Sequence, residues 1–98
     1  MINLIKTGKI YRIYSTIGFN SISLYTVETP PPIIEDTSIV FKIRNGSMVV
    51  PLLIRNKCGI FNLVTTNIKV LTEFGSIGWL LIYEDEYLFN EAFLDDEQ

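Results

Sequence analysis

The chain has 98 residues, of which 48% are hydrophobic and 19% are charged, with one cysteine and no histidine. This length corresponds to one domain with a modest core. The lack of histidine excludes hydrolases that use a histidine base. With a single cysteine, Cys58, this chain can form neither a Cys/His zinc site nor an internal disulfide.

Charge is distributed unevenly along the chain. Residues 1–73 carry all eight lysines and arginines and four acids, whereas residues 84–98 carry seven acids and no base. The net charge of −3 is therefore the sum of a mildly basic segment, residues 1–73, and an acidic tail, residues 84–98.

The first two strands are predicted at Gly8–Thr16 and Ser21–Glu28, because β-branched and aromatic residues recur there and Gly18–Asn20 supply a turn. The Pro30, Pro31 and Pro32 run in the next segment lacks three amide donors. We therefore expect an exposed loop or polyproline II segment there.

The clearest strand pattern lies at Thr37–Arg44, where apolar and polar residues alternate. Asn45-Gly46 then predicts a tight hairpin, because both residues tolerate the positive φ of a type I′ turn. The returning strand is expected at Ser47–Arg55. Pro51 within it predicts either an edge position or a bulge.

The rest of the chain is also expected to consist mainly of short strands separated by turns. The expected elements are a turn at Asn56–Gly59, two strands or one long bent strand over Ile60–Glu73, a turn at Phe74–Ser76, a last strand at Ile77–Tyr83 and a short helix within Glu84–Leu94.

Six or seven short strands without strand–helix–strand alternation predict an all-β fold. We expect a small antiparallel barrel of five to seven strands over residues 1–83, followed by a short C-terminal helix and acidic tail over residues 84–98. The barrel core is expected to include Phe41, Phe61 and Trp79.

One segment is similar to a known architecture. Over Ile68–Leu80 a strand ends in Phe74-Gly75-Ser76, and the next strand carries Gly78-Trp79 followed by leucine. This arrangement resembles the distal hairpin of small SH3-like barrels, and the resemblance extends over Gly59–Phe89. It implies an SH3-like fold but no proline-motif binding, because the paired tryptophan of peptide-binding SH3 domains is absent.

The size and the isoleucine- and asparagine-rich composition also resemble viral or phage accessory proteins. No Gly-rich phosphate loop and no calcium-loop spacing occurs in the sequence, so we predict no enzyme activity, no cofactor and no metal. The acidic clusters are interpreted as solvated charge.

The favoured function is therefore a protein–protein interaction module that binds a host or virion protein, with homo-oligomer formation left open. Amphipathic aromatic side chains and a stiff proline loop suit such contacts. The predicted contact residues are Tyr11, Tyr14, Tyr25, Pro30, Pro31, Pro32 and Tyr83.

Two alternatives remain open. A nucleic-acid-binding barrel would use basic side chains together with tyrosine stacking. Its candidate residues are Arg12, Lys42, Arg44, Arg55 and Lys57. The other alternative is a protein that captures a small ligand or nucleotide at a subunit interface.

We expect no membrane insertion, because no apolar run approaches the roughly 18 residues that a spanning helix needs. The N-terminal residues also lack the pattern of a secretion signal. The expected location is the host cytoplasm or the virion.

Overall fold

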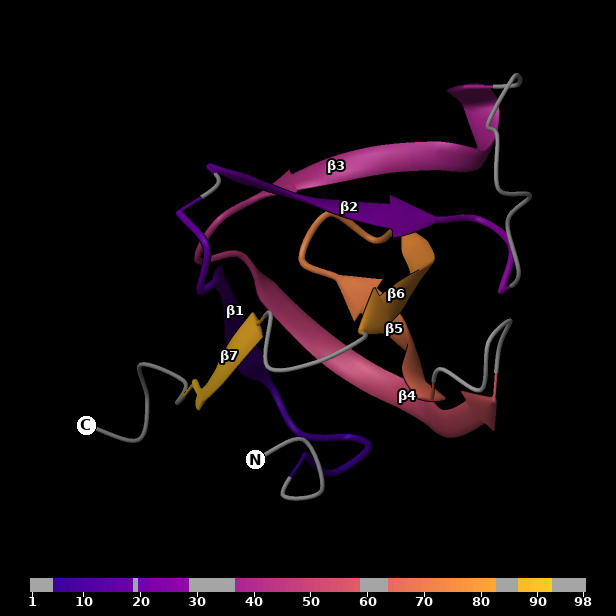
Figure 1. The fold of residues 1–98 in the computed structure, drawn as a ribbon. Coiled ribbons are helices and arrows are strands. Elements are labelled where there is room, and N and C mark those ends of the chain that lie inside the picture. Colours follow the sequence, from indigo (N-terminus) through magenta and orange to yellow (C-terminus); the bar gives the residue numbers. More distant parts are fainter. Residues whose placement is uncertain (1–4, 19, 29–36, 59–63, 83–86, 93–98) are drawn as a thin grey trace.

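A computed structural model describes residues 5–18, 20–28, 37–58, 64–82 and 87–92. In these residues the chain forms a seven-stranded antiparallel sheet that curls into a half-barrel (Figure 1). The all-β prediction is confirmed. The elements are β1 (Tyr11–Ser15), β2 (Ser21–Tyr25), the 3-10 helix η2 (Thr37–Ile39), β3 (Val40–Arg44), β4 (Met48–Cys58), β5 (Val64–Thr72), β6 (Ile77–Ile82) and β7 (Tyr87–Glu91).

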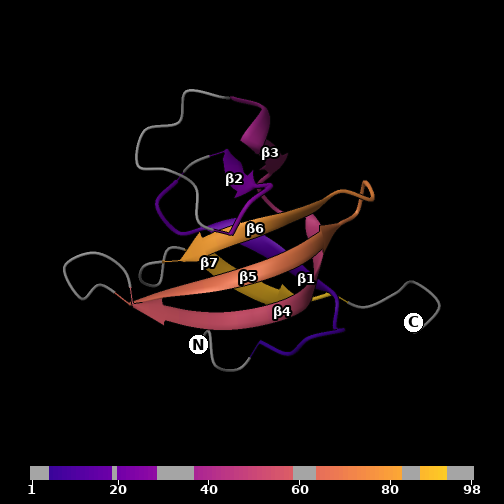
Figure 2. The same ribbon diagram turned by 90° about the vertical axis from the view of Figure 1, so that its right-hand side faces the viewer.

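The strands lie in the order β3-β2-β6-β5-β4-β1-β7. β4, β5 and β6 form a continuous curved meander, and the β2–β3 pair lies above it in Figure 2. β2 joins this meander through one register pair, Tyr25 opposite Trp79. The sheet therefore consists of a central β4–β6 meander, the β1–β7 pair beside β4, and a narrow β2–β3 ribbon beside β6. The connection between the ribbon and the meander is short.

The predicted hairpin at Asn45-Gly46 is wrong, although a turn does form there. The Ser47 amide donates to the Arg44 carbonyl at 3.1 Å, and Gly46 has a φ of +88°. β3 and β4 are nevertheless not neighbours in the sheet. The turn instead lies along β1, where the Gly46 amide donates to the Ile13 carbonyl at 2.7 Å. The Asn45-Gly46 dipeptide thus specifies the local turn, but it does not determine that the strands on either side of the turn pair with each other.

Pro51 lies at a bulge, as one of the two sequence alternatives predicted. The β4–β5 register shifts between Pro51 and Leu53, and β4 is an interior strand. The Pro51 carbonyl accepts the Gly8 amide at 2.9 Å. Because the nitrogen and carbonyl of one residue point the same way in an antiparallel strand, the missing N–H faces the N-terminal segment and not β5.

β4 continues through residues 56–58, where a turn was predicted, so that prediction is wrong over these residues. Of the two alternatives for residues 60–73, one long strand fits the described part, since β5 is unbroken from Val64 to Thr72. The predicted turn at residues 74–76 is confirmed, because the Gly75 amide donates to the Thr72 carbonyl at 3.0 Å.

Residues 87–91 form strand β7 where the sequence predicted a helix, and this strand pairs with β1 along its full length. The half-buried Tyr87 and Phe89 alternate with exposed neighbours. In such a short segment the apolar spacing fits either period, and the free edge of β1 selects the strand. Residues 84–86 and 93–94 of the predicted helix lie outside the described residues.

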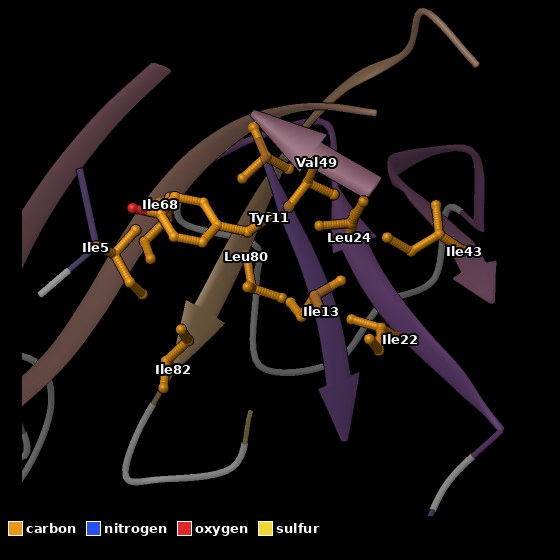
Figure 3. Packing of buried hydrophobic residues seen from close by; sticks show 11 residues of the cluster. Ile5, Tyr11, Ile13, Ile22, Leu24, Ile43, Val49, Ile68, Leu80 and Ile82 are labelled. Atoms are coloured by element: carbon orange, nitrogen blue, oxygen red, sulfur yellow. The ribbon is translucent and has the colours of Figure 1, made fainter. Parts of the chain in front are cut away.

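The core lies on the concave face of the half-barrel. Figure 3 shows the side chains of Ile13, Ile22 and Leu80 pointing toward one another. β1 through β6 each contribute at least one buried side chain, and the cluster consists of Ile5, Tyr11, Ile13, Ile22, Leu24, Ile43, Val49, Ile68, Val70, Leu80 and Ile82.

The aromatic residues that were predicted to be core have different positions. Phe41 is half-buried and packs against the core. Trp79 is also half-buried, but it lies between the buried Gly78 and Leu80, so its side chain points to the outer face of β6. Phe61 lies outside the described residues.

Gly78 permits the ribbon to pack closely on the meander. A Cβ at this position would lie 2.7 Å from Phe41 Cζ and 3.0 Å from Leu24 Cβ. The ring of Phe41 on β3 therefore occupies the space above Gly78 on β6. This contact adds to the single register pair that joins β2 to β6.

Candidate interaction surfaces

The tyrosines predicted as partner contacts lie in different environments. Tyr11 is 6% exposed, and its hydroxyl accepts the Lys6 amide at 2.9 Å, so it belongs to the core and offers little surface to a partner. Tyr14 and Tyr25 are half-buried on β1 and β2, which are not adjacent in the sheet. The other predicted contact residues, Pro30, Pro31, Pro32 and Tyr83, lie outside the described residues.

Two of the predicted basic residues have partners within the chain. Arg55 forms an ion pair with Glu28 at 3.0 Å. The Arg12 guanidinium donates to the Gly46 carbonyl at 3.0 Å. The side chains of Arg55 and Arg12 are thus held by contacts within the protein itself.

The two basic residues of β3 lie on one face of that strand. Lys42 and Arg44 are exposed on either side of the buried Ile43. The side chain of Lys57 lies outside the described residues. The structure therefore brings together Lys42 and Arg44 and separates them from Arg55, which lies on β4.

The outer face of the β4–β6 meander is unusually apolar. Register pairs place Val50, Leu71 and Ile77 side by side across three strands. A second row aligns Leu53, Lys69 and Trp79, and Tyr25 continues it on β2. We define the six residues of these rows other than Lys69, together with Phe74 of the adjoining β5–β6 turn, as the outer apolar face; Lys69 lies within the second row.

The β5–β6 turn contributes the most exposed part of this face. Phe74 is 74% exposed, and Ile77 is 50% exposed. The turn is held in place by Glu73, whose amide donates to the Met48 carbonyl at 3.1 Å and whose carboxylate accepts the Met48 amide at 3.2 Å. Two large apolar side chains are therefore presented to solvent on an ordered turn.

A shallow pocket lies at the same end of the sheet. Its volume is about 200 Å³, which is below the roughly 300–1,000 Å³ typical of ligand pockets. It suits one inserted side chain better than a nucleotide. The lining residues are Ile10, Met48, Val49, Val50, Leu71, Thr72 and Glu73.

One exposed ion pair ties the N-terminal segment to β7. Lys9 Nζ lies 3.0 Å from Glu91 Oε1. This hydrogen bond, with the attraction between the two charges, raises the pKa of Lys9 above its ordinary value. The ion pair joins the N-terminal segment to β7.

Within the described ranges, no group of three or more acidic or cysteine side chains is arranged to hold a metal. No helix among the same residues has the length and hydropathy to span a bilayer.

No protein family matches the chain, and no curated protein or solved structure is significantly similar to it.

The outer apolar face was not predicted from the sequence, although one sequence feature indicates it. The run Trp79-Leu80-Leu81-Ile82 is apolar on both faces of its strand.

Proposed function

We propose that this protein is a non-enzymatic interaction module that binds a partner protein through the outer apolar face. The observation that supports this is the pair of cross-strand rows with Leu71, Ile77 and Trp79 on the face opposite the core. The solvent face of an antiparallel sheet is ordinarily polar. A contiguous exposed apolar surface on a soluble domain is typical of a binding site.

Phe74 and Ile77 are expected to supply much of the affinity. Burying an exposed side chain of this size contributes about 1.5–3 kcal/mol. Each 1.4 kcal/mol corresponds to a tenfold change in affinity. Replacing both residues by smaller polar ones should therefore weaken partner binding at least tenfold.

The test compares wild type with a Phe74→Ser/Ile77→Thr variant and an Ile17→Thr control. Ile17 is 61% exposed, lies in the turn after β1 and is not one of the residues of the outer apolar face. In affinity capture from a host or virion extract, the wild type and the control should retain the same protein. The double variant should lose it while keeping its denaturation midpoint. Equal recovery by all three proteins, or none by wild type, would contradict the proposal.

We also propose that the half-barrel is SH3-like over residues 59–89. This part is supported by the β5–β6 hairpin, in which Gly78 and Trp79 lie on β6, and by the curled antiparallel sheet. An experimental structure in which these strands do not superpose on an SH3 barrel would exclude this part.

The proposed setting is that of a viral or phage accessory protein acting in the host cytoplasm or in the virion. This part is supported by the size and composition of the chain alone. Immunoblotting of purified virions and of infected-cell cytoplasm tests it directly, since absence of the protein from both would reject it.

A further inference from the structure

In the part of the chain that the structure describes, one edge of strand β3 pairs with no other strand. It is the first strand in the sheet order, and among the described residues it pairs only with β2. At the top of Figure 1, β3 runs along the outside of the ribbon with β2 beneath it. Open edges present backbone groups to which another strand can add.

Hydrogen bonds at both ends of β3 show which backbone groups point outward. The Thr26 amide donates to the Ile39 carbonyl at 2.8 Å, and the Asn45 amide donates to the Asn20 carbonyl at 2.9 Å. The backbone N–H and C=O groups of odd-numbered β3 residues thus point toward β2, and those of even-numbered residues point away from it. The outward groups are the Val40 carbonyl, the Lys42 amide and carbonyl, and the Arg44 amide.

Positive charge flanks this edge. The exposed side chains of Lys42 and Arg44 lie on the outer face of β3, and neither forms an ion pair with another described residue. On the opposite face, Phe41 and Ile43 pack against the core. A strand added here would have the two cationic side chains beside one of its faces and the apolar side chains of Phe41 and Ile43 beside the other.

This charge pattern disfavours a second copy of the chain as the added strand. The antiparallel pairing that overlaps all of β3 with its own copy would place Lys42 directly opposite Lys42. Like charges opposite one another destabilise a strand pair, and edge lysines commonly block self-association. The same charges favour a strand that carries carboxylates.

We propose that the β3 edge is a second binding site, separate from the outer apolar face, which accepts an extended acidic peptide as an eighth strand. In an antiparallel arrangement, carboxylates lie opposite Arg44 and Lys42, with apolar residues opposite Ile43, Phe41 and Val40. The peptide therefore alternates acidic and apolar residues, in the order acidic, apolar, acidic, apolar, apolar.

The test uses the blocked peptide Glu-Val-Glu-Val-Val and its counterpart Lys-Val-Lys-Val-Val, each titrated into isotopically labelled protein. The acidic peptide should shift the Lys42 and Arg44 amide resonances and slow hydrogen exchange at the Lys42 amide. Raising sodium chloride from about 50 mM to about 500 mM should weaken binding several-fold, because exposed charges are screened. The basic peptide should cause no such shifts.

Charge reversal supplies the matched variants. Lys42→Glu should reduce affinity for the acidic peptide about tenfold, the equivalent of 1.4 kcal/mol. Lys6→Glu, which makes the same charge change at an exposed lysine before β1, should alter it less than twofold. Lys42→Gln provides the charge-neutral version if the Glu variant does not fold.

Several results would overturn the proposal. They are equal binding of the two peptides, shifts confined to other strands, dimer formation through β3, and larger shifts of the same amides by a single-stranded oligonucleotide of about ten thymidines. The Phe74→Ser/Ile77→Thr variant should bind the acidic peptide normally. Failure of one site is therefore distinguishable from failure of the other.

Discussion

Gly78 and Phe41 determine how closely the ribbon approaches the meander. A methyl group at Gly78 would enter the space of the Phe41 ring and of Leu24, at distances below ordinary carbon contacts. Gly78→Ala should therefore destabilise the protein by about 1–3 kcal/mol, the usual cost of adding atoms to a packed core. Urea denaturation of the two proteins measures this difference.

Measuring Gly78→Ala again in a Phe41→Leu protein tests whether the cost comes from the Phe41 ring. A smaller side chain leaves room for the methyl group, so Gly78→Ala should cost less when residue 41 is leucine. A coupling of about 1 kcal/mol in the double-mutant cycle would agree with direct contact. Strict additivity of the two substitutions would show that the contact does not determine stability.

Gly46 and Gly75 form a natural comparison because both have positive φ, +88° and +85°. A Cβ at Gly46 would lie 3.3 Å from Tyr14 Cε1, whereas one at Gly75 would meet nothing within 4 Å. Alanine at either position incurs the left-handed backbone cost, about 1–2 kcal/mol. Gly46→Ala should therefore be the more destabilising substitution.

The measurement is again the free energy of unfolding, in wild type and in a Tyr14→Leu background. Removing the ring should bring the cost of Gly46→Ala down to that of Gly75→Ala. If Gly75→Ala proves as costly as Gly46→Ala in the wild-type protein, the Tyr14 contact contributes nothing.

At the scale of elements, local sequence signals predicted the strands better than their partners. The strand predicted over Thr37–Arg44 forms only from Val40 onward, because residues 37–39 are a 3-10 helix, whereas the turn at residues 74–76 forms as predicted. Both predictions depended on alternation or glycine within a few residues. The pairing of β3 with β2, and of β7 with β1, depends on contacts between segments distant in sequence. A tight-turn dipeptide and a five-residue apolar pattern contain no information about those contacts.

The same distinction applies to the candidate sites. Lys42 and Arg44 are two residues apart in a strand that the sequence predicted from its alternation, so they share a face, as the structure shows. The rows through Leu71 and Ile77 exist only because of cross-strand register, which the sequence does not reveal. Tyr11 was predicted as a surface contact because tyrosine is amphipathic, but its hydroxyl is satisfied by the Lys6 amide inside the fold.

For the whole molecule, the uneven connection between ribbon and meander predicts uneven stability. β5 is paired over most of its length with β4 and β6, whereas β2 meets β6 at one register position. Regions with fewer cross-strand bonds open at lower free energy than the global unfolding reaction. The β2–β3 ribbon should therefore open while β4, β5 and β6 remain folded.

Native-state hydrogen exchange tests this order of opening. The Ile68 and Val70 amides of β5 should exchange at the free energy of global unfolding. The Ile43 amide, which faces β2, should exchange at a lower free energy that depends little on denaturant. Phe41→Ala should lower protection in the ribbon more than in β5, because the ring above Gly78 is one of the contacts that hold the ribbon down. Equal protection of both regions would instead indicate that the half-barrel unfolds as one cooperative unit.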